Sequence, residues 1–205
     1  MEGVAAFVLA GGRSRRMGQD KALLQLGEST LLTRALALAA SVSADVRIVG
    51  DMQRFLPFGR VVEDVFPGHG PLGGIHAALR QSATELNLML AVDLPFVESG
   101  FLAYLISSAS QCAAVVTVPR SADGWQPLCA VYRREFADVA ERALRKGKNR
   151  IDALFAQIEV RAVGRDEWER MGFSAEMFRN LNTPEEWERA KMKLGLSTRE
   201  AGGPG

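Results

Sequence analysis

The chain has 205 residues, of which 47% are hydrophobic and 24% charged, and its formal net charge is +1. This composition excludes a disordered chain, and the small net charge gives no general attraction to nucleic acid or to a membrane. Two cysteines without metal-site spacing fit a reducing compartment, and no apolar run reaches the ~20 residues of a membrane span. We therefore expect a cytoplasmic protein with neither nucleic-acid nor membrane partners.

Short apolar runs alternate with helical patterns along almost the whole chain. The first run, Val4–Ala10, is apolar at every position, which is typical of a strand covered on both faces. In chain order the patterns predict a strand at 4–10, a helix at 30–43, strands at 45–50 and 60–64, a helix at 73–82, a strand at 86–93, a helix at 101–109, strands at 113–119 and 127–132, helices at 135–146 and 151–156, a strand at 158–163 and a helix at 184–194.

Strands separated by helices indicate right-handed crossovers and a mainly parallel sheet. We therefore expect an α/β fold with three layers, doubly wound, in which residues 1–194 form a single domain. The strands at 113–119 and 127–132 leave little room for a helix between them, so this pair is expected to be antiparallel. The polar tail, residues 195–205, ends Ala-Gly-Gly-Pro-Gly and is expected to be disordered.

A glycine-rich basic loop, Gly11–Lys21, directly follows the first strand. Ligands of parallel α/β sheets bind beyond the carboxyl ends of the strands, and two glycines allow a ligand to approach the backbone closely. Arginine matches phosphate oxygens with paired donors, and lysine adds a mobile point charge. The loop therefore predicts a site for a nucleoside triphosphate. A solvated basic loop is the structural alternative, and the spacing does not fit a Walker A motif.

A second glycine pattern, Gly68–Gly73, matches G-x-G-x-x-G, and Asp93 follows about 20 residues later. This pattern would suit a dinucleotide-dependent oxidoreductase. However, Val65-Phe66-Pro67 separates the preceding strand from the first glycine, and the basic loop would remain unexplained. The dinucleotide reading is therefore a minor rival.

Two aspartates, Asp64 and Asp93, end predicted strands at the edge of the sheet where the basic loop begins. Mg²⁺ is typically held by one or two carboxylates together with phosphates and water. Asp93 is the better candidate for a metal ligand, because Leu94-Pro95-Phe96 separates it from the next helix. For Asp64, the structural alternative to a functional role is that it caps the next helix. The two histidines, His69 and His76, are more typical of loop or packing residues than of catalysts.

The basic loop resembles the signature of the molybdenum cofactor guanylyltransferase family. The resemblance covers nearly the whole chain except the tail. It rests on Leu9-Ala10-Gly11-Gly12-Arg13-Ser14-Arg15-Arg16-Met17-Gly18-Gln19-Asp20-Lys21, followed in the family's order by Glu63-Asp64, Gly70-Pro71-Leu72-Gly73-Gly74-Ile75, Asp93-Leu94-Pro95-Phe96, Gln126-Pro127-Leu128-Cys129-Ala130-Val131-Tyr132 and Asn182-Thr183-Pro184-Glu185-Glu186. The first segment is shared in looser form by many nucleotidyltransferases, and the later segments narrow the resemblance.

The resemblance implies a Rossmann-like nucleotidyltransferase that uses GTP and Mg²⁺ to transfer GMP to molybdenum-molybdopterin, with release of pyrophosphate. It also implies transient contact with other proteins of cofactor biosynthesis. The implied residues are Leu9, Ala10, Gly11, Gly12, Lys21, Asp64 and Asp93 for the nucleotide, Asp93 for the metal, Lys21, Asp93 and Arg16 for catalysis, and Asn180 and Asn182 on the acceptor side.

Three alternatives remain open at this point. Relatives that use CTP tend to read Leu-Ala-Ala-Gly where this chain has Leu-Ala-Gly-Gly, so GTP is favoured over cytidylyl transfer. Transfer to a sugar phosphate, or a nucleotide sensor without catalysis, would use the same pocket. One departure concerns base recognition, since this chain has Asp51 where some members of the family carry an asparagine.

Overall fold

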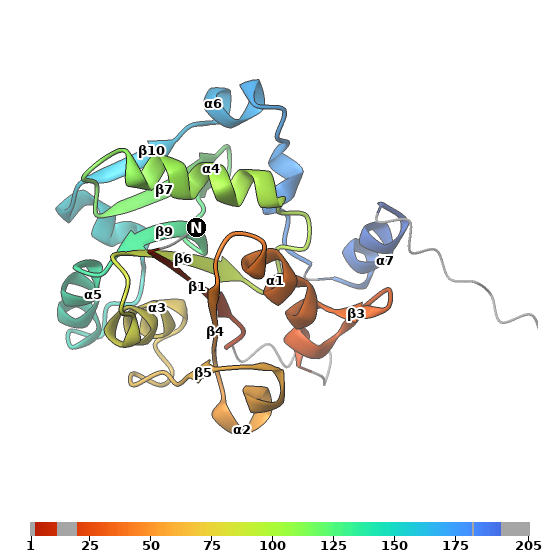
Figure 1. Cartoon of the computed structure of the whole chain (residues 1–205), viewed down its shortest axis with the longest axis horizontal. Coiled ribbons are helices and arrows are strands. Elements are labelled where there is room, and N and C mark those ends of the chain that lie inside the picture. Colours follow the sequence, from red (N-terminus) through yellow and green to blue (C-terminus); the bar gives the residue numbers. More distant parts are fainter. Residues whose placement is uncertain (1–2, 12–19, 182, 194–205) are drawn as a thin grey trace, which may run out of the picture.

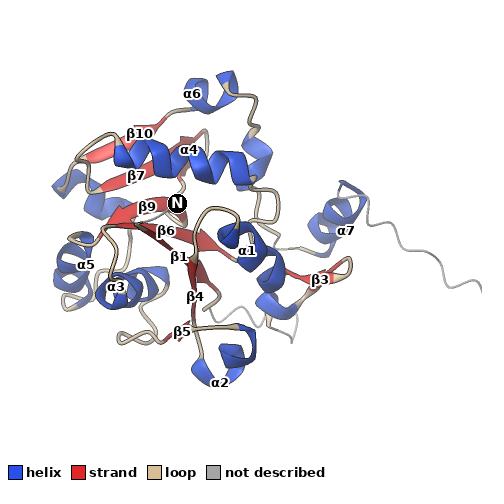
Figure 2. Ribbon diagram, in the orientation of Figure 1, coloured by secondary structure: helices blue, strands red, loops and turns tan. Residues whose placement is uncertain are grey.

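The structure, a computed structural model, describes residues 3–11, 20–181 and 183–193. Its centre is one twisted sheet (Figure 2). In spatial order its strands are β10 (Val160–Val163), β7 (Val116–Ser121), β9 (Cys129–Arg133), β6 (Leu86–Ala91), β1 (Val4–Leu9), β4 (Asp45–Val49) and β5 (Val61–Val62), while β8 (Gly124–Trp125) pairs with β7 off this path.

The sheet is mainly parallel, as the sequence predicts. β1 is parallel to β4 and β6, β4 to β5, and β10 to β7, whereas β9 is antiparallel to both of its neighbours. The expectation of an antiparallel pair in the middle of the chain is therefore confirmed. Because two antiparallel pairings restore the original direction, β7 runs parallel to β6 and β1, and its carboxyl end lies at the same edge of the sheet.

Helices cover both faces of the sheet and complete the three layers (Figure 1). α1 (Leu31–Ala40), α4 (Ser99–Ser110) and α6 (Arg165–Arg170) lie on one face, and α3 (Pro71–Gln81) and α5 (Phe136–Leu144) on the other. The packing of β1 explains why its own residues are apolar at every position. Its alternate residues join separate cores, with Val4, Ala6 and Val8 beneath α1 and α4, and Ala5, Phe7 and Leu9 beneath α3 and α5.

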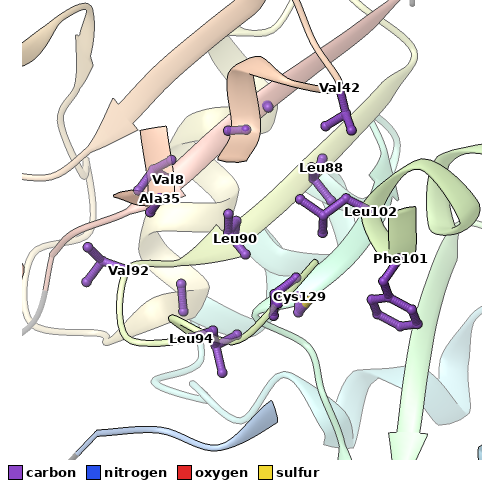
Figure 3. Packing of buried hydrophobic residues seen from close by; sticks show 14 of the residues in the cluster. Val8, Ala35, Val42, Leu88, Leu90, Val92, Leu94, Phe101, Leu102 and Cys129 are labelled. Carbon is purple, nitrogen blue, oxygen red and sulfur yellow. The ribbon is translucent and has the colours of Figure 1, made fainter. Parts of the chain in front are cut away.

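The core beneath α1 and α4 is shown in Figure 3. Leu88 and Leu90 of β6 and Cys129 of β9 lie in one cluster with Phe101 and Leu102 of α4, and all five are fully buried or nearly so. Burial of a Leu or Phe side chain stabilises a fold by about 1.5–3 kcal/mol. The packing of this layer therefore fixes the position of the strand ends, where the candidate site lies.

Several short elements are absent from the sequence-based prediction. They are the hairpin of β2 (Gln25–Leu26) and β3 (Ser29–Thr30), the helix α2 (Met52–Phe55), β8, α6, and the 3₁₀ helices η1 (Lys21–Leu23), η2 (Leu56–Phe58) and η4 (Ala175–Phe178). The segment predicted as a short helix at 151–156 is the 3₁₀ helix η3 (Asp152–Gln157). The last described helix, α7 (Pro184–Lys193), lies beside the β2–β3 hairpin (Figure 1).

Candidate functional site

The carboxyl end of β1 lies at a topological switch point of the sheet. The chain leaves β1 for β4 and β5 on one side and returns to β6 on the other side. Ligands of open α/β sheets bind in the crevice that such a reversal creates. The backbone here is held from both sides, since the N–H groups of Ala10 and Gly11 donate to the Val49 carbonyl (3.0 and 3.1 Å) and the Leu9 carbonyl accepts from Val92 (3.2 Å).

Lys21 and Asp93 meet at this edge although they are 72 residues apart. The Lys21 Nζ lies 2.8 Å from Asp93 Oδ2, and the two side chains are 15% and 24% exposed. Asp93 follows β6, and Lys21 is the first residue of η1. The structure thus brings together the lysine and the aspartate that sequence patterns single out separately. A paired cation and carboxylate that both remain accessible can contact phosphates and a cation within one small volume.

Asp20 places Lys21 by capping η1. Its carboxylate accepts a hydrogen bond from the Ala22 N–H (3.0 Å), which is a typical start of a helical turn. The same carboxylate forms an ion pair with Arg54 of α2. From the sequence alone, Asp20 stands out only as part of the basic-loop signature, without a role of its own, and Arg54 does not stand out. The Asp-x-x-Arg pattern at Asp51, which caps α2 by accepting from the Arg54 N–H (3.0 Å), could have indicated this helix but not its contact with Asp20.

Asp64 lies against the first turn of α3. Its Oδ1 accepts a hydrogen bond from the Phe66 N–H (2.7 Å), within the loop between β5 and α3. A Cβ added at Gly73 would stand 2.5–2.9 Å from the Asp64 carboxyl group, so only a glycine leaves room for this carboxylate. Residue Gly70 caps α3 without a side-chain hydrogen bond, so the structure does not bear out the alternative of Asp64 as a helix cap.

Burial raises the pKa of the Asp64 carboxyl group above its ordinary value, because desolvation disfavours the charged form more than the Phe66 hydrogen bond favours it. Burial lowers the pKa of His76, whose Nε2 is 3.5 Å from Glu141 Oε2. His76 and His69 both pack edge-on against Phe66, with ring centroids 5.1 and 6.1 Å apart. Their placement is that of packing residues around the Asp64 loop.

The geometry does not fit a dinucleotide site at Gly68–Gly73. β5 ends at Val62, and five residues separate it from Gly68, while α3 begins at Pro71. A dinucleotide fold requires the first glycine in a tight turn directly after the strand. The rival reading of this motif is therefore wrong.

A hairpin, formed by the end of β7 and by β8, extends beyond the carboxyl edge on the far side of β6. Arg120 and Trp125 are a cross-strand pair in it, and the Arg120 guanidinium carbon lies 5.0 Å from the centroid of the Trp125 ring. Gln126 follows, and its side chain donates to the Ser121 hydroxyl (3.0 Å). Sequence reasoning noted the segment from Gln126 onward but missed the Arg120–Trp125 pair.

Of the remaining candidate residues, one lies within the described ranges and three lie outside them. Asn180 is exposed and follows Phe178, whose ring packs 5.6 Å from that of Phe101 in the first turn of α4. This contact places Asn180 near the carboxyl edge. Gly12, Arg16 and Asn182 lie outside the described residues, as does the tail.

Within the described ranges, no group of three or more His, Cys, Asp or Glu side chains is arranged to hold a metal ion by itself. None of the helices that the structure describes is both long and apolar enough to cross a bilayer.

Comparison with known proteins gives a consistent result. A family model described as a MobA-like NTP transferase domain matches residues 6–162. Two relatives are a "Probable molybdenum cofactor guanylyltransferase" of Pelotomaculum thermopropionicum, 36% identical with 90% of each chain covered, and a "Molybdenum cofactor guanylyltransferase" of Desulfosudis oleivorans, 34% identical with 95% of this chain and 97% of that one covered.

Among solved structures, the molybdopterin-guanine dinucleotide biosynthesis protein A of Archaeoglobus fulgidus has a TM-score of 0.82 and 26% identity, and covers 93% of this chain and 98% of its own. The switch point of the sheet and the residues at its strand ends agree with these similarities. The chain belongs to the molybdenum cofactor guanylyltransferase family, within the MobA-like NTP transferases.

Proposed function

We propose that this protein transfers GMP from GTP to the phosphate of molybdenum-molybdopterin. An oxygen of the acceptor phosphate forms a bond to the α-phosphorus of GTP, and the bond from that phosphorus to the bridging oxygen breaks to release pyrophosphate. The observation that carries the proposal is the ion pair of Lys21 and Asp93 at the switch point of a chain of this family. Transfer of this kind depends mainly on positioning and charge stabilisation.

The nucleotide half of the proposed site lies over β1, β4 and β5. Leu9, Ala10 and Gly11 contact the nucleotide, and the fixed backbone at Ala10 and Gly11 supports a rigid contact. Gly12 is assigned to the same group from its place in the sequence. Lys21 binds the triphosphate. Asp64 contacts the guanosine part, and its raised pKa agrees with a carboxylate that is only partly solvated before a ligand arrives.

The metal half of the proposal rests on Asp93. A single carboxylate beside a lysine suits Mg²⁺ that arrives with a nucleotide, because such Mg²⁺ is held by one or two carboxylates and by the phosphates. Bound there, the ion supplies positive charge that stabilises the developing pyrophosphate. Lys21 contributes charge from the protein itself, and Arg16 is assigned to the same catalytic group from its place in the basic loop.

The remaining parts of the proposal concern the acceptor side and the protein as a whole. Asn180 and Asn182 are assigned to the acceptor side, and residues 1–194 to a single domain. We place the protein in the cytoplasm, with no nucleic-acid partner and with transient contacts to other cofactor-biosynthesis proteins.

The test is a pyrophosphate-release assay with molybdenum-molybdopterin, Mg²⁺ and each of GTP, CTP, ATP and UTP. We expect release with GTP at a kcat/KM at least roughly tenfold above that with CTP, the discrimination that one site-specific hydrogen bond gives. Equal or faster release with CTP would contradict the guanine assignment and leave the reaction class standing. Nucleotide binding without release in any of the four assays would indicate a sensor instead.

A further inference from the structure

The Arg120–Trp125 pair projects from the carboxyl edge of the sheet, on the side that the nucleotide residues do not occupy. Arg120 is the fifth residue of β7, and the two residues before it in the same alternation, Val116 and Val118, belong to the core beneath α3 and α5. Trp125 packs against the same core, and its ring meets that of Phe155 edge-on at 5.4 Å. The base of the pair is therefore anchored by packing.

The hairpin is attached to the segment that carries Asp93. The Ala91 N–H, two residues before Asp93, donates to the Leu128 carbonyl (2.7 Å), and the Gln126 N–H donates to the Pro119 carbonyl (2.9 Å). Only β9 separates β7 from β6, so the two strand ends lie about 10 Å apart, twice the ~4.8 Å strand spacing. An arginine at that distance can contact a ligand that also reaches Asp93.

The guanidinium of Arg120 is held without a carboxylate. Arg120 is exposed, and among the described residues it forms a cation–π contact with Trp125 and no ion pair. Stacking on a ring uses the face of the guanidinium and leaves its N–H donors at the rim. Arg133 contrasts with it, because its donors are used by Glu85 and by backbone carbonyls at the other edge of the sheet. The arrangement suits an external anion.

We propose that Arg120 binds the phosphate monoester of the acceptor and that Trp125 is a positioning residue that holds the guanidinium ready for it. The inference rests on the proposed function and names one contact of its second substrate. The strand order supports this division, since the nucleotide residues follow β1 and β5, Asp93 follows β6, and Arg120 lies beyond β9. The phosphates of GTP share the same chemistry, so the experiment has to separate the two sources.

The experiment measures pyrophosphate release with GTP and molybdenum-molybdopterin, each varied in turn, for the full chain and five variants. We expect Arg120→Ala to raise the acceptor KM by roughly 10- to 100-fold, which is typical of losing a hydrogen-bonded ion contact, with the GTP KM unchanged. Arg120→Lys keeps the charge but not the paired donors, and we expect an intermediate acceptor KM.

Trp125→Leu removes the ring and should raise the acceptor KM by about 2- to 5-fold, whereas Trp125→Phe keeps a ring face and should stay near the wild type. The matched control is Arg134→Ala, an exposed arginine just after β9 at the opposite edge, which should change neither KM. Melting temperatures of all variants separate this effect from unfolding, since a purely structural hairpin would lower Tm without moving the acceptor KM alone.

Three outcomes would overturn the inference. A rise of the GTP KM in Arg120→Ala would assign the arginine to the triphosphate, and an unchanged acceptor KM would leave it without a role in binding. Equal effects of Trp125→Leu and Trp125→Phe would remove the positioning role. Absence of pyrophosphate release by the wild-type chain is a different result, because it contradicts the proposed function and the inference falls with it.

Discussion

At the scale of single residues, the ion pair of Lys21 and Asp93 links the two strongest signals in the sequence. Each residue could be assigned from its own surroundings, the lysine from the basic loop and the aspartate from the end of an apolar strand. Their contact could be expected because parallel strands end at the same edge. The Asp20–Arg54 pair could not be expected, because it depends on how the fold brings Arg54 of α2 close to a residue 34 positions earlier in the chain.

Replacement of Asp93 tests the metal and charge roles of this pair. Asp93→Asn keeps a hydrogen-bond acceptor for Lys21 but removes the negative charge, so the fold and metal-free GTP binding should persist. We expect kcat to fall by ~10²–10³, the loss that follows removal of one well-placed electrostatic contact. Pyrophosphate release and calorimetric GTP binding without Mg²⁺ are measured on the same preparation.

Asp45→Asn is the matched control, because it disturbs an ion pair of similar length and exposure at the opposite edge of the sheet. Asp45 Oδ2 lies 2.7 Å from Arg47 Nη2, and Asp45 is 28% exposed. It should change Tm about as much as Asp93→Asn does while leaving kcat near the wild-type value. Equal, near-wild-type turnover in both variants would remove Asp93 from the metal site.

At the scale of elements, the long buried strands and the helices between them follow from the sequence because burial on two faces leaves an uninterrupted apolar run. Short elements escape prediction for the opposite reason. α6 buries only Trp168, and β8 is a two-residue strand that exists through its pairing with Arg120 and Ser121. Their conformations depend on contacts with distant parts of the chain, which local patterns do not contain.

The start of α3 shows how an element shapes the site. Helix propensity alone predicts that Gly73→Ala stabilises the protein, by about 0.5–1 kcal/mol. The structure predicts a loss of function instead, because the new Cβ would stand 2.5–2.9 Å from the Asp64 carboxyl group and displace it. We expect the GTP Kd to rise by roughly tenfold, the cost of one contact to a charged group.

Two comparisons make this test specific. Gly164→Ala adds a Cβ at an ordinary φ of −74° where no atom lies within 4 Å, and it should leave the GTP Kd unchanged. In an Asp64→Ala background, Gly73→Ala should have little further effect, because the displaced carboxylate is already absent. Additive effects of the two substitutions would show that Gly73 acts independently of Asp64.

At the scale of the whole molecule, one sheet supports both cores, so residues 1–194 are expected to unfold as a single unit. The tryptophans report on the two sides separately, because Trp168 is fully buried in the core of α1 and α4 while Trp125 packs against the core of α3 and α5. Trp168 also belongs to a segment beyond residues 6–162, the part that the family model matches. If Trp168 and the rest of the protein unfold together, this segment therefore belongs to the same domain.

The measurement uses two chains that each keep one of these reporters, Trp168→Phe with Trp187→Phe, and Trp125→Phe with Trp187→Phe. Phenylalanine preserves most of the packing, and at Trp168 it removes an indole N–H that has no hydrogen-bond partner among the described residues. We expect the fluorescence midpoint in urea to agree with the midpoint by circular dichroism within each chain, as two-state unfolding requires. A Trp168 midpoint clearly below the circular-dichroism midpoint of its own chain would show that the C-terminal segment detaches first. The single-domain proposal would then be wrong, because the layers that share the sheet would not share their stability.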